Sequence, residues 1–278
     1  MTRKPKSYHR VLTVAGSDSG GGAGVQADLK TMSALGCYGM SAFAALTAQN
    51  TKEVRAIHEV PPTFLAAQID AVVEDIGVDA VKIGMLFNAE LIQAVADRIE
   101  EYQLEKVVLD PVMVSQSGHQ LIEDEAIEVL QTTLFPLCEV ITPNLPEAEK
   151  LLDTDIKTED DIETAARDLL QMGPRAVLLK GGHLLEESES ADCLVMALPG
   201  DKGIDIHWYR SRRIDTSNTH GTGCTLSSAI ASARAKGKSL PEAVQTAKNY
   251  ITEAIRAGSE YQLGEGSGPL HHFYQTWT

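Results

Sequence analysis

Apolar runs of strand length alternate with segments of helical periodicity along almost the whole 278-residue chain. After Pro62, for example, Leu65, Ile69 and Val72 recur on one helical face. Strands that are joined by helices pair in parallel, so the alternation predicts an α/β fold with a largely parallel central sheet and helices on both faces. The strand-length runs are residues 11–15, 41–48, 54–60, 80–85, 107–109, 140–142 and 176–180.

Two later segments depart from this alternation. Residues 192–198 and 204–213 are separated by the turn-rich sequence Pro-Gly-Asp-Lys-Gly, which predicts a small antiparallel hairpin at one edge of the sheet. Two helices should then close the chain. No fixed-period repeat, low-complexity tract or long linker interrupts the sequence, so we expect a single domain over residues 1–278.

The composition is that of a globular protein with an acidic balance. Hydrophobic residues make up 43% of the chain, charged residues make up 23%, and the formal net charge is -15. This excludes a disordered chain, and it leaves no overall positive surface for nucleic acid or for an anionic membrane. A phosphate ligand would have to be bound by local positive charge, from helix N-termini, a few lysines and a divalent metal.

The four cysteines lie far apart and show no paired spacing. The first ten residues are polar and basic, without the apolar stretch of a secretion signal, and no apolar run reaches membrane-spanning length. These observations predict reduced thiols in a cytoplasmic protein.

Residues 219–225, Thr-His-Gly-Thr-Gly-Cys-Thr, are followed at once by a run of small, helix-compatible residues. The glycines let backbone N–H groups converge, and the positive end of the following helix points to the same place. Such a stretch can bind a phosphate or a developing anion without a cationic side chain. Cys224 lies within it, where the pKa of a thiol is expected to fall. We interpret Gly221, Thr222, Gly223 and Cys224 as a reaction centre.

Another glycine-rich stretch, residues 16–24, follows a predicted strand and opens a helix. Gly22, Gly24 and Ala27 match the loose dinucleotide-binding pattern G-x-G-x-x-A, but no acidic residue ends the next strand to bind a ribose. The Gly-Lys-Ser/Thr of a Walker loop does not occur in the sequence. A flexible turn would explain the stretch, but five glycines in nine positions exceed what one turn requires. We therefore favour close approach of the backbone to a ligand.

Gln49 ends a predicted strand, where open α/β sheets place their ligand crevice. Its amide offers a donor and an acceptor, which suits a nitrogen heterocycle with an exocyclic amine. A strand-end amide that is hydrogen-bonded to a loop is an equally good interpretation. Asp28 lies one turn into the first helix, and its position alone predicts a solvated surface charge.

Four polar residues follow other predicted strands. Asn144 and Glu147 open a helix, either as a capping box or as part of a site for Mg²⁺, which prefers oxygen ligands. Asp110 adds a second carboxylate at a strand end. Lys180 precedes two glycines and could reach a phosphate, although a lysine at a strand end is most often solvated.

Taken together, these residues are similar to the ribokinase superfamily, and within it to the hydroxymethylpyrimidine/phosphomethylpyrimidine kinases of thiamine biosynthesis. The matching stretches follow the family's order along nearly the whole chain. One departure is Gly20, where the family more usually has a second serine. The stretches are residues 15–31, 48–51, 82–85, 108–113, 141–149, 179–183, 218–225 and 268–273.

This resemblance implies a three-layer ribokinase-like fold, a homodimer, and phosphoryl transfer from ATP with Mg²⁺. The acceptors would be 4-amino-5-hydroxymethyl-2-methylpyrimidine and then its monophosphate. The resemblance implies that the pyrimidine pocket is lined by Gly16, Asp28, Gln49, Met85 and Val112. It implies that ATP is bound by Asn144, Glu147, Lys180 and Thr219, that Mg²⁺ is held by Glu147 and Asp110 directly or through water, and that residues 221–224 form the anion hole.

A pyridoxal kinase of the same superfamily, or an enzyme with both activities, is the nearest alternative. Relatives with pyridoxal activity usually differ at residues 48–51, which here keep the pyrimidine-kinase form Ala-Gln-Asn-Thr. More distant alternatives are a nicotinamide-dependent oxidoreductase and a non-catalytic ligand-binding regulator.

Cys224 is the nearest candidate base for the first phosphorylation, at a position where many ribokinase relatives have aspartate. In the second phosphorylation the acceptor is a largely ionised phosphate, which needs no base and would be repelled by a carboxylate. A thiol that stays neutral would tolerate both acceptors.

Overall fold

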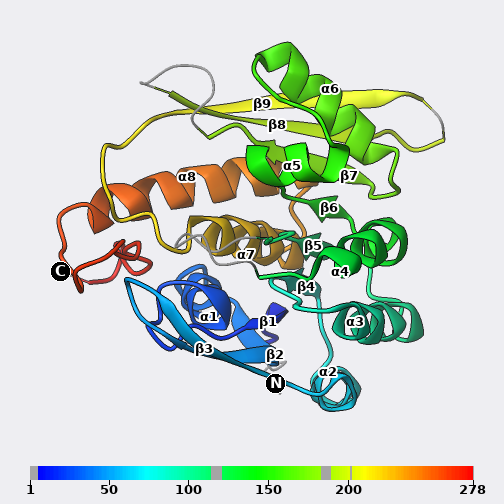
Figure 1. The fold of residues 1–278 in the computed structure, drawn as a ribbon, viewed down its shortest axis with the longest axis horizontal. Helices are drawn as coiled ribbons and strands as arrows, with labels where there is room; N and C mark the ends of the chain where they lie inside the picture. Colours follow the sequence, from blue (N-terminus) through cyan, green and yellow to red (C-terminus); the bar gives the residue numbers. More distant parts are fainter. Residues whose placement is uncertain (1–5, 114–120, 183–188, 201, 278) are drawn as a thin grey trace, which may run out of the picture.

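The computed structural model describes residues 6–113, 121–182, 189–200 and 202–277. Within these residues the centre of the protein is a nine-stranded sheet with the order β3-β2-β1-β4-β5-β6-β7-β8-β9 (Figure 1). The strands are β1 (Arg10–Gly16), β2 (Tyr38–Gln49), β3 (Val54–Glu59), β4 (Ala80–Ile83), β5 (Val107–Leu109), β6 (Val140–Ile141), β7 (Ala176–Lys180), β8 (Glu189–Ala197) and β9 (Ile204–Arg212).

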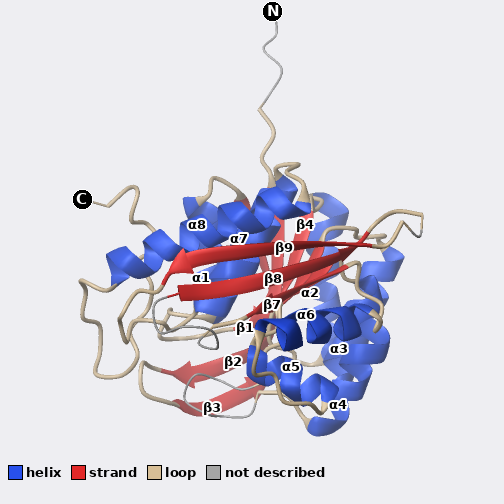
Figure 2. Cartoon of the chain, turned by 90° about the horizontal axis from the view of Figure 1, so that it is seen from above, coloured by secondary structure: helices blue, strands red, loops and turns tan. Residues whose placement is uncertain are grey.

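The middle of the sheet is parallel and both edges are antiparallel. Strands β2, β1, β4, β5, β6 and β7 pair in parallel, as the alternation of strands and helices predicts. Strands β8 and β9 form the expected antiparallel hairpin, far from β3 (Figure 2). The antiparallel direction of β3 follows from its short connection to β2, because a parallel crossover needs a dozen or more residues.

Helices cover both faces of the sheet and complete the three expected layers (Figure 1). Val11 of β1 packs with α1, α7 and α8, whereas Leu12 packs with the helices of the other face, since successive side chains of a strand point in opposite directions. No helix in the described ranges is long and apolar enough to cross a membrane. The helices are α1 (Gly24–Ala34), α2 (Pro62–Asp75), α3 (Ala89–Glu101), α4 (Asp124–Val129), α5 (Leu145–Leu152), α6 (Glu159–Leu170), α7 (Thr222–Ala235) and α8 (Leu240–Gly258), with short π and 3₁₀ turns at Leu130–Leu134 and Phe135–Leu137.

The carboxyl ends of the parallel strands gather the predicted site residues at one edge of the sheet. Gly16, Gln49 and Lys180 are the last residues of β1, β2 and β7, and Asp110 directly follows β5. Strand β4 ends two residues before Met85. Open parallel sheets bind their ligands at this edge.

Candidate active site

The N-terminus of α7 lies against both the first glycine-rich turn and the end of β5. Gly221 precedes the helix with φ of 86°, and a Cβ atom there would overlap the carbonyl oxygen of Gly22. A Cβ atom on Gly223 would lie 2.9 Å from Oδ2 of Asp110. No side chain among the described residues caps this helix end, so its partial positive charge remains available to an anion.

Backbone hydrogen bonds fix the turn that leads into α7. The N–H of Thr222 donates to the carbonyl of Thr219 at 3.3 Å, and the N–H of Thr225 donates to the carbonyl of Gly221 at 2.9 Å. Cys224 lies next in the same turn and is partly exposed. Residues 221–224, which the resemblance implies form the anion hole, therefore lie together at the first turn of α7.

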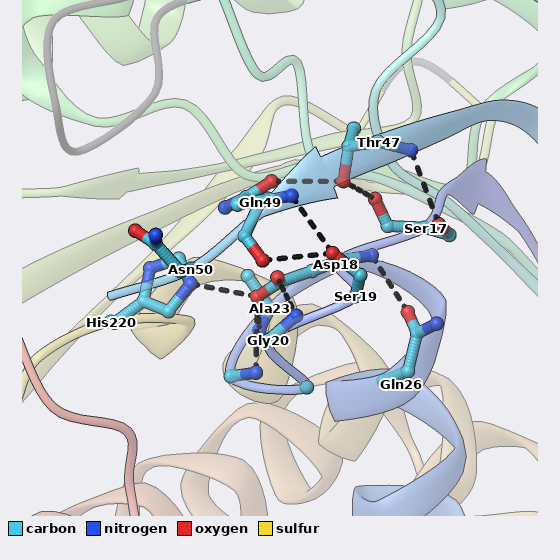
Figure 3. A network of polar contacts seen from close by, with 12 residues as sticks. Ser17, Asp18, Ser19, Gly20, Ala23, Gln26, Thr47, Gln49, Asn50 and His220 are labelled. Atoms are coloured by element: carbon cyan, nitrogen blue, oxygen red, sulfur yellow. Dashed lines mark hydrogen bonds and ion pairs between the residues drawn. The ribbon is translucent and has the colours of Figure 1, made fainter. Parts of the chain in front are cut away.

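Asp18 holds the first glycine-rich turn together (Figure 3). Its side chain is buried; Oδ1 accepts the N–H of Gly20 at 2.8 Å, and Oδ2 accepts the N–H of Gly22 at 3.0 Å. Oδ2 also contacts Nε2 of His220 at 2.8 Å, which ties the turn to the residue before Gly221. Asp18 and His220 lie in the two glycine-rich stretches but were not predicted as site residues, although an aspartate in a turn commonly caps nearby N–H groups.

The glycines of this turn approach other parts of the protein. A Cβ atom on Gly24 would overlap the carbonyl oxygen of Gly16, and one on Gly22 would overlap the ring of His220. Tight packing within the protein therefore accounts for glycine at these positions. Close approach to a ligand stays a prediction for this turn.

Gln49 is anchored by its backbone beside the same turn (Figure 3). Its N–H donates to Oγ of Ser19 at 2.8 Å, and that hydroxyl donates to the carbonyl of Gln49 at 2.8 Å. Oγ1 of Thr47 lies 3.2 Å from Oε1 of the Gln49 side chain. The backbone of Gln49 is thus bonded to the turn, whereas its side-chain amide contacts Thr47 of the same strand rather than a loop. A role in reading a substrate ring stays a prediction.

Gly16, Met85 and Val112 come together around a small apolar cluster. Met85 packs with Ala45 and Leu121, and the half-buried Val112 packs against them. A Cβ atom on Gly16 would lie 2.7 Å from the terminal methyl of Met85. The glycine at the end of β1 therefore makes room for this side chain.

Asp28 is not the surface charge that its position predicts. Its side chain is 0% exposed and pairs with the equally buried Lys82 of β4, with 2.8 Å between Oδ2 and Nζ. Thr13 and Ser228 donate to the carboxylate at 2.6 and 2.7 Å. A charge can be buried here because an opposite charge 54 residues along the chain lies beside it, which the local pattern of α1 cannot reveal. Direct contact of Asp28 with a substrate stays a prediction.

A second ion pair joins the ends of β5 and β7. Nζ of Lys180 lies 2.8 Å from Oδ1 of Asp110, so Lys180 is not the solvated lysine of the alternative interpretation. Asn144 and Glu147 form the expected capping box at the start of α5. Burial raises the pKa of Glu147 to about 7; Lys180 opposes this rise and Asp110 adds to it. Lys180 is therefore the positive charge that acts on both the Asp110 and the Glu147 carboxylates.

The carboxylates of Glu147 and Asp110 fit a magnesium ion that is also bound by the phosphate oxygens of a ligand. Within the described ranges no three His, Cys, Asp or Glu side chains gather into a metal site. Magnesium, however, is commonly held by one or two carboxylates together with waters and phosphate oxygens. A buried carboxylate with a raised pKa, such as Glu147, would gain the counter-charge that it lacks.

The thiol of Cys224 does not have the lowered pKa that its helix position predicts. Burial raises the pKa of Cys224 to about 11; Lys82 opposes this rise, whereas Asp28 and Asp110 add to it. Desolvation and two carboxylates outweigh the helix end. The thiol is therefore protonated at neutral pH. All four cysteines are described and are free thiols, as their spacing predicts.

The phosphomethylpyrimidine kinase family model matches residues 18–271. The chain belongs to this family. It is 45% identical to the hydroxymethylpyrimidine/phosphomethylpyrimidine kinase of Escherichia coli K12, over 96% of this chain and 98% of that protein. It is 53% identical to the thiamine biosynthesis bifunctional protein ThiED of Geobacter sulfurreducens over 97% of this chain, and it spans 53% of that longer protein.

A solved kinase structure shares the fold. The structure of the pyridoxal kinase from Staphylococcus aureus in complex with AMP-PCP and pyridoxal matches with a TM-score of 0.86 and 32% identity, and the match covers 98% of this chain and 96% of that one. The ribokinase-like fold and the kinase family that the motifs imply are thus confirmed. The chain is an enzyme of a kinase family.

Proposed function

We propose that this phosphomethylpyrimidine kinase family member phosphorylates 4-amino-5-hydroxymethyl-2-methylpyrimidine with ATP and then phosphorylates the monophosphate, in thiamine diphosphate biosynthesis. One observation carries this proposal. A Cβ atom on Gly223 would lie 2.9 Å from Oδ2 of Asp110 and 3.5 Å from Nζ of Lys180. The N-terminus of α7, which suits an anion, therefore lies next to the ammonium group of Lys180. Phosphoryl transfer depends mainly on such positioning and charge stabilisation. The name of the Escherichia coli relative supports both acceptors.

The acceptor ring would lie on the apolar cluster. Gly16, Met85 and Val112 would contact the faces of a flat pyrimidine, and the Gln49 amide would pair with its ring nitrogen and exocyclic amine. Asp28 would line the same pocket, with its carboxylate held in place by Thr13, Lys82 and Ser228.

The nucleotide phosphates would lie at the Lys180 end. Lys180, Asn144 and Thr219 would bind ATP. The complex of a similar pyridoxal kinase with AMP-PCP, an ATP analogue, supports ATP as the nucleotide. Glu147 and Asp110 would hold Mg²⁺, directly or through water. When bound, the metal neutralises charge on the phosphate oxygens.

The start of α7 would stabilise the transferring group between these two ends. The backbone of Gly221, Thr222 and Gly223 with the helix dipole would face its oxygens. Cys224 would lie beside the acceptor oxygen. A protonated thiol is not a preformed base, so the acceptor hydroxyl would lose its proton late, to an oxygen of the transferred phosphoryl group, which a loose transition state permits. The same uncharged thiol would not repel the monophosphate in the second step.

A pyridoxal kinase activity is the second candidate. The match to the pyridoxal-bound kinase favours it, because that fold with that acceptor aligns over nearly the whole chain. We also propose that the protein acts as a cytoplasmic homodimer. The family resemblance suggests the dimer, and the free thiols suit the compartment.

An assay coupled to ADP formation tests these assignments with hydroxymethylpyrimidine, its monophosphate and pyridoxal as acceptors. We expect ADP to form with both pyrimidines and to form more slowly with pyridoxal. Turnover with pyridoxal alone would contradict the pyrimidine assignment, and acceptor-independent ATP hydrolysis would contradict both candidates.

A further inference from the structure

A buried ion pair lies beneath the Cys224 end of the site, and the phosphate chemistry proposed above does not require Lys82. The side chains of Lys82 and Asp28 are both 0% exposed. Removing two charges from water is unfavourable, and a buried pair often gives no more stability than apolar residues of the same volume. Stability alone is therefore a weak reason for this pair.

The surroundings orient the pair. Asp28 accepts hydrogen bonds from Thr13, Ser228 and Lys82. Lys82, in contrast, donates to a single acceptor among the described residues, although an ammonium group has three donors. The carboxylate is thus fixed by its neighbours, and the ammonium group keeps capacity to stabilise further negative charge.

Gly84, two residues after Lys82, leaves room for the ammonium group. A Cβ atom on Gly84 would lie 2.7 Å from Nζ of Lys82. Residues two apart at a strand end point to the same side. A side chain at position 84 would therefore displace the charge, and glycine keeps it in place.

Helix α7 brings the pair close to the reacting end of the site. Ser228 donates to Asp28 and lies one helical turn after Cys224, so these two residues share a face of α7. Lys82 from β4, Asp28 from α1 and Asp110 after β5 are the charged groups that act on the thiol, together with the N–H of Gly24.

We propose that Lys82 is a positioning residue of the phosphoryl-transfer site: its ammonium group, held by Asp28, is a fixed positive charge that favours the minor thiolate form of the otherwise neutral Cys224 and stabilises negative charge on the transferring group. The effect on the transferring group rests on the proposed function, whereas the effect on Cys224 does not. Lys82 exchanges no proton and forms no bond. Burial would lower the pKa of Lys82, but Asp28 and the other acidic groups raise it, so Lys82 is charged at neutral pH.

Alkylation of Cys224 by iodoacetamide, an uncharged reagent, tests the charge effect without substrate or metal. The variants are Lys82→Met, Asp28→Asn and the double variant, with folding checked by circular dichroism and the label located by peptide mass spectrometry. Two comparisons remove only the Lys82 charge: wild type against Lys82→Met, and Asp28→Asn against the double variant. We expect the Cys224 rate to fall on the order of tenfold in each comparison.

A merely structural role predicts the opposite change. Lost packing would expose the partly exposed Cys224 further and raise its alkylation rate in every variant. Unchanged or faster alkylation on removal of the Lys82 charge, in each comparison whose members fold, would overturn the inference. If Lys82→Met does not fold because Asp28 is left unpaired, the comparison of Asp28→Asn with the double variant tests the inference.

Steady-state kinetics separate this inference from the proposed function. We expect Lys82→Met or the double variant to lower kcat at least tenfold with little change in the KM for the pyrimidine, because Lys82 does not contact it. A wild-type protein that phosphorylates no pyrimidine acceptor would refute the proposed function, and the alkylation comparison would still decide whether Lys82 acts on Cys224.

Discussion

At the scale of single residues, the surroundings of Cys224 override its place in the sequence. A helix N-terminus favours a thiolate, but burial and the carboxylates Asp28 and Asp110 favour the thiol. The sequence revealed the helix end and could not reveal these neighbours, which come from α1 and from the end of β5. An uncharged group beside the acceptor suits two acceptors of different charge.

Cys224→Asp is expected to impair phosphorylation of the monophosphate more than phosphorylation of the alcohol. A carboxylate would repel the anionic acceptor, which corresponds to about a tenfold larger loss in kcat/KM for the second step. The measurement is kcat/KM for each acceptor. Cys224→Ser is the neutral control and should affect both steps alike. An equal loss in both steps with Cys224→Asp would contradict the account of the thiol.

Glu147 should make the stability of the metal-free protein depend on pH. Burial raises the pKa of Glu147 to about 7 in the folded protein, above its value in the unfolded chain. The folded protein therefore binds more protons between these two values, and its free energy of unfolding falls as the pH rises through that interval. At lower pH the group is protonated in both states and has no effect.

Glu147→Gln removes this dependence. In the presence of EDTA at about pH 8 we expect the variant to be more stable than the wild type by about 1–3 kcal/mol, and at about pH 4 the two should be equal. Urea denaturation at both pH values provides the comparison. A variant that is less stable than the wild type at the higher pH would show that Glu147 is not held against its charged form.

At the scale of elements, the two helix N-termini assigned to the proposed phosphate end of the site begin in different ways. Helix α5 begins with a capping box, which the spacing of Asn144 and Glu147 predicts. Helix α7 begins uncapped behind the left-handed Gly221, at the helix start that the sequence predicts there. The contact of Gly221 with Gly22 was not predictable, because it joins two distant turns.

Asn144→Ala should lower both stability and activity. The lost cap destabilises α5 by about 1 kcal/mol, because Asn144 Oδ1 no longer accepts the backbone N–H of Glu147 and the first turn that carries this carboxylate loosens. Thr158→Ala is the matched control, because Thr158 caps α6 with the same box and was not predicted as a site residue. We expect equal losses of unfolding free energy and a loss of kcat/KM in Asn144→Ala only. Equal activity of the two variants would remove Asn144 from the proposed site.

Gly221→Ala tests the contact between the two glycine-rich turns. Alanine would have to adopt the left-handed region and would overlap the carbonyl of Gly22. Gly237→Ala is the control, since Gly237 has φ of 83° and, apart from its chain neighbours, no described residue has an atom within 4 Å of its Cβ position. We expect about 1 kcal/mol of destabilisation in the control, and at least twice that with loss of activity in Gly221→Ala. Similar effects in thermal denaturation would mean that the contact is loose.

At the scale of the whole molecule, periodicity predicted the parallel middle of the sheet and its two helical layers, and the turn-rich sequence between β8 and β9 predicted their hairpin. It missed the direction of β3. It also missed the pairs Asp28–Lys82 and Asp18–His220, because each joins segments that only the fold brings together. The single domain stays a prediction, which the one continuous sheet supports.

The central claim is that one site phosphorylates an alcohol and then a phosphate. Phosphorus NMR of a mixture of the protein, hydroxymethylpyrimidine, ATP and Mg²⁺ follows both products in time. We expect a monophosphate signal that rises and then falls as the two signals of a diphosphate appear. A monophosphate that accumulates without any diphosphate, or inorganic phosphate as the sole product, would contradict the claim.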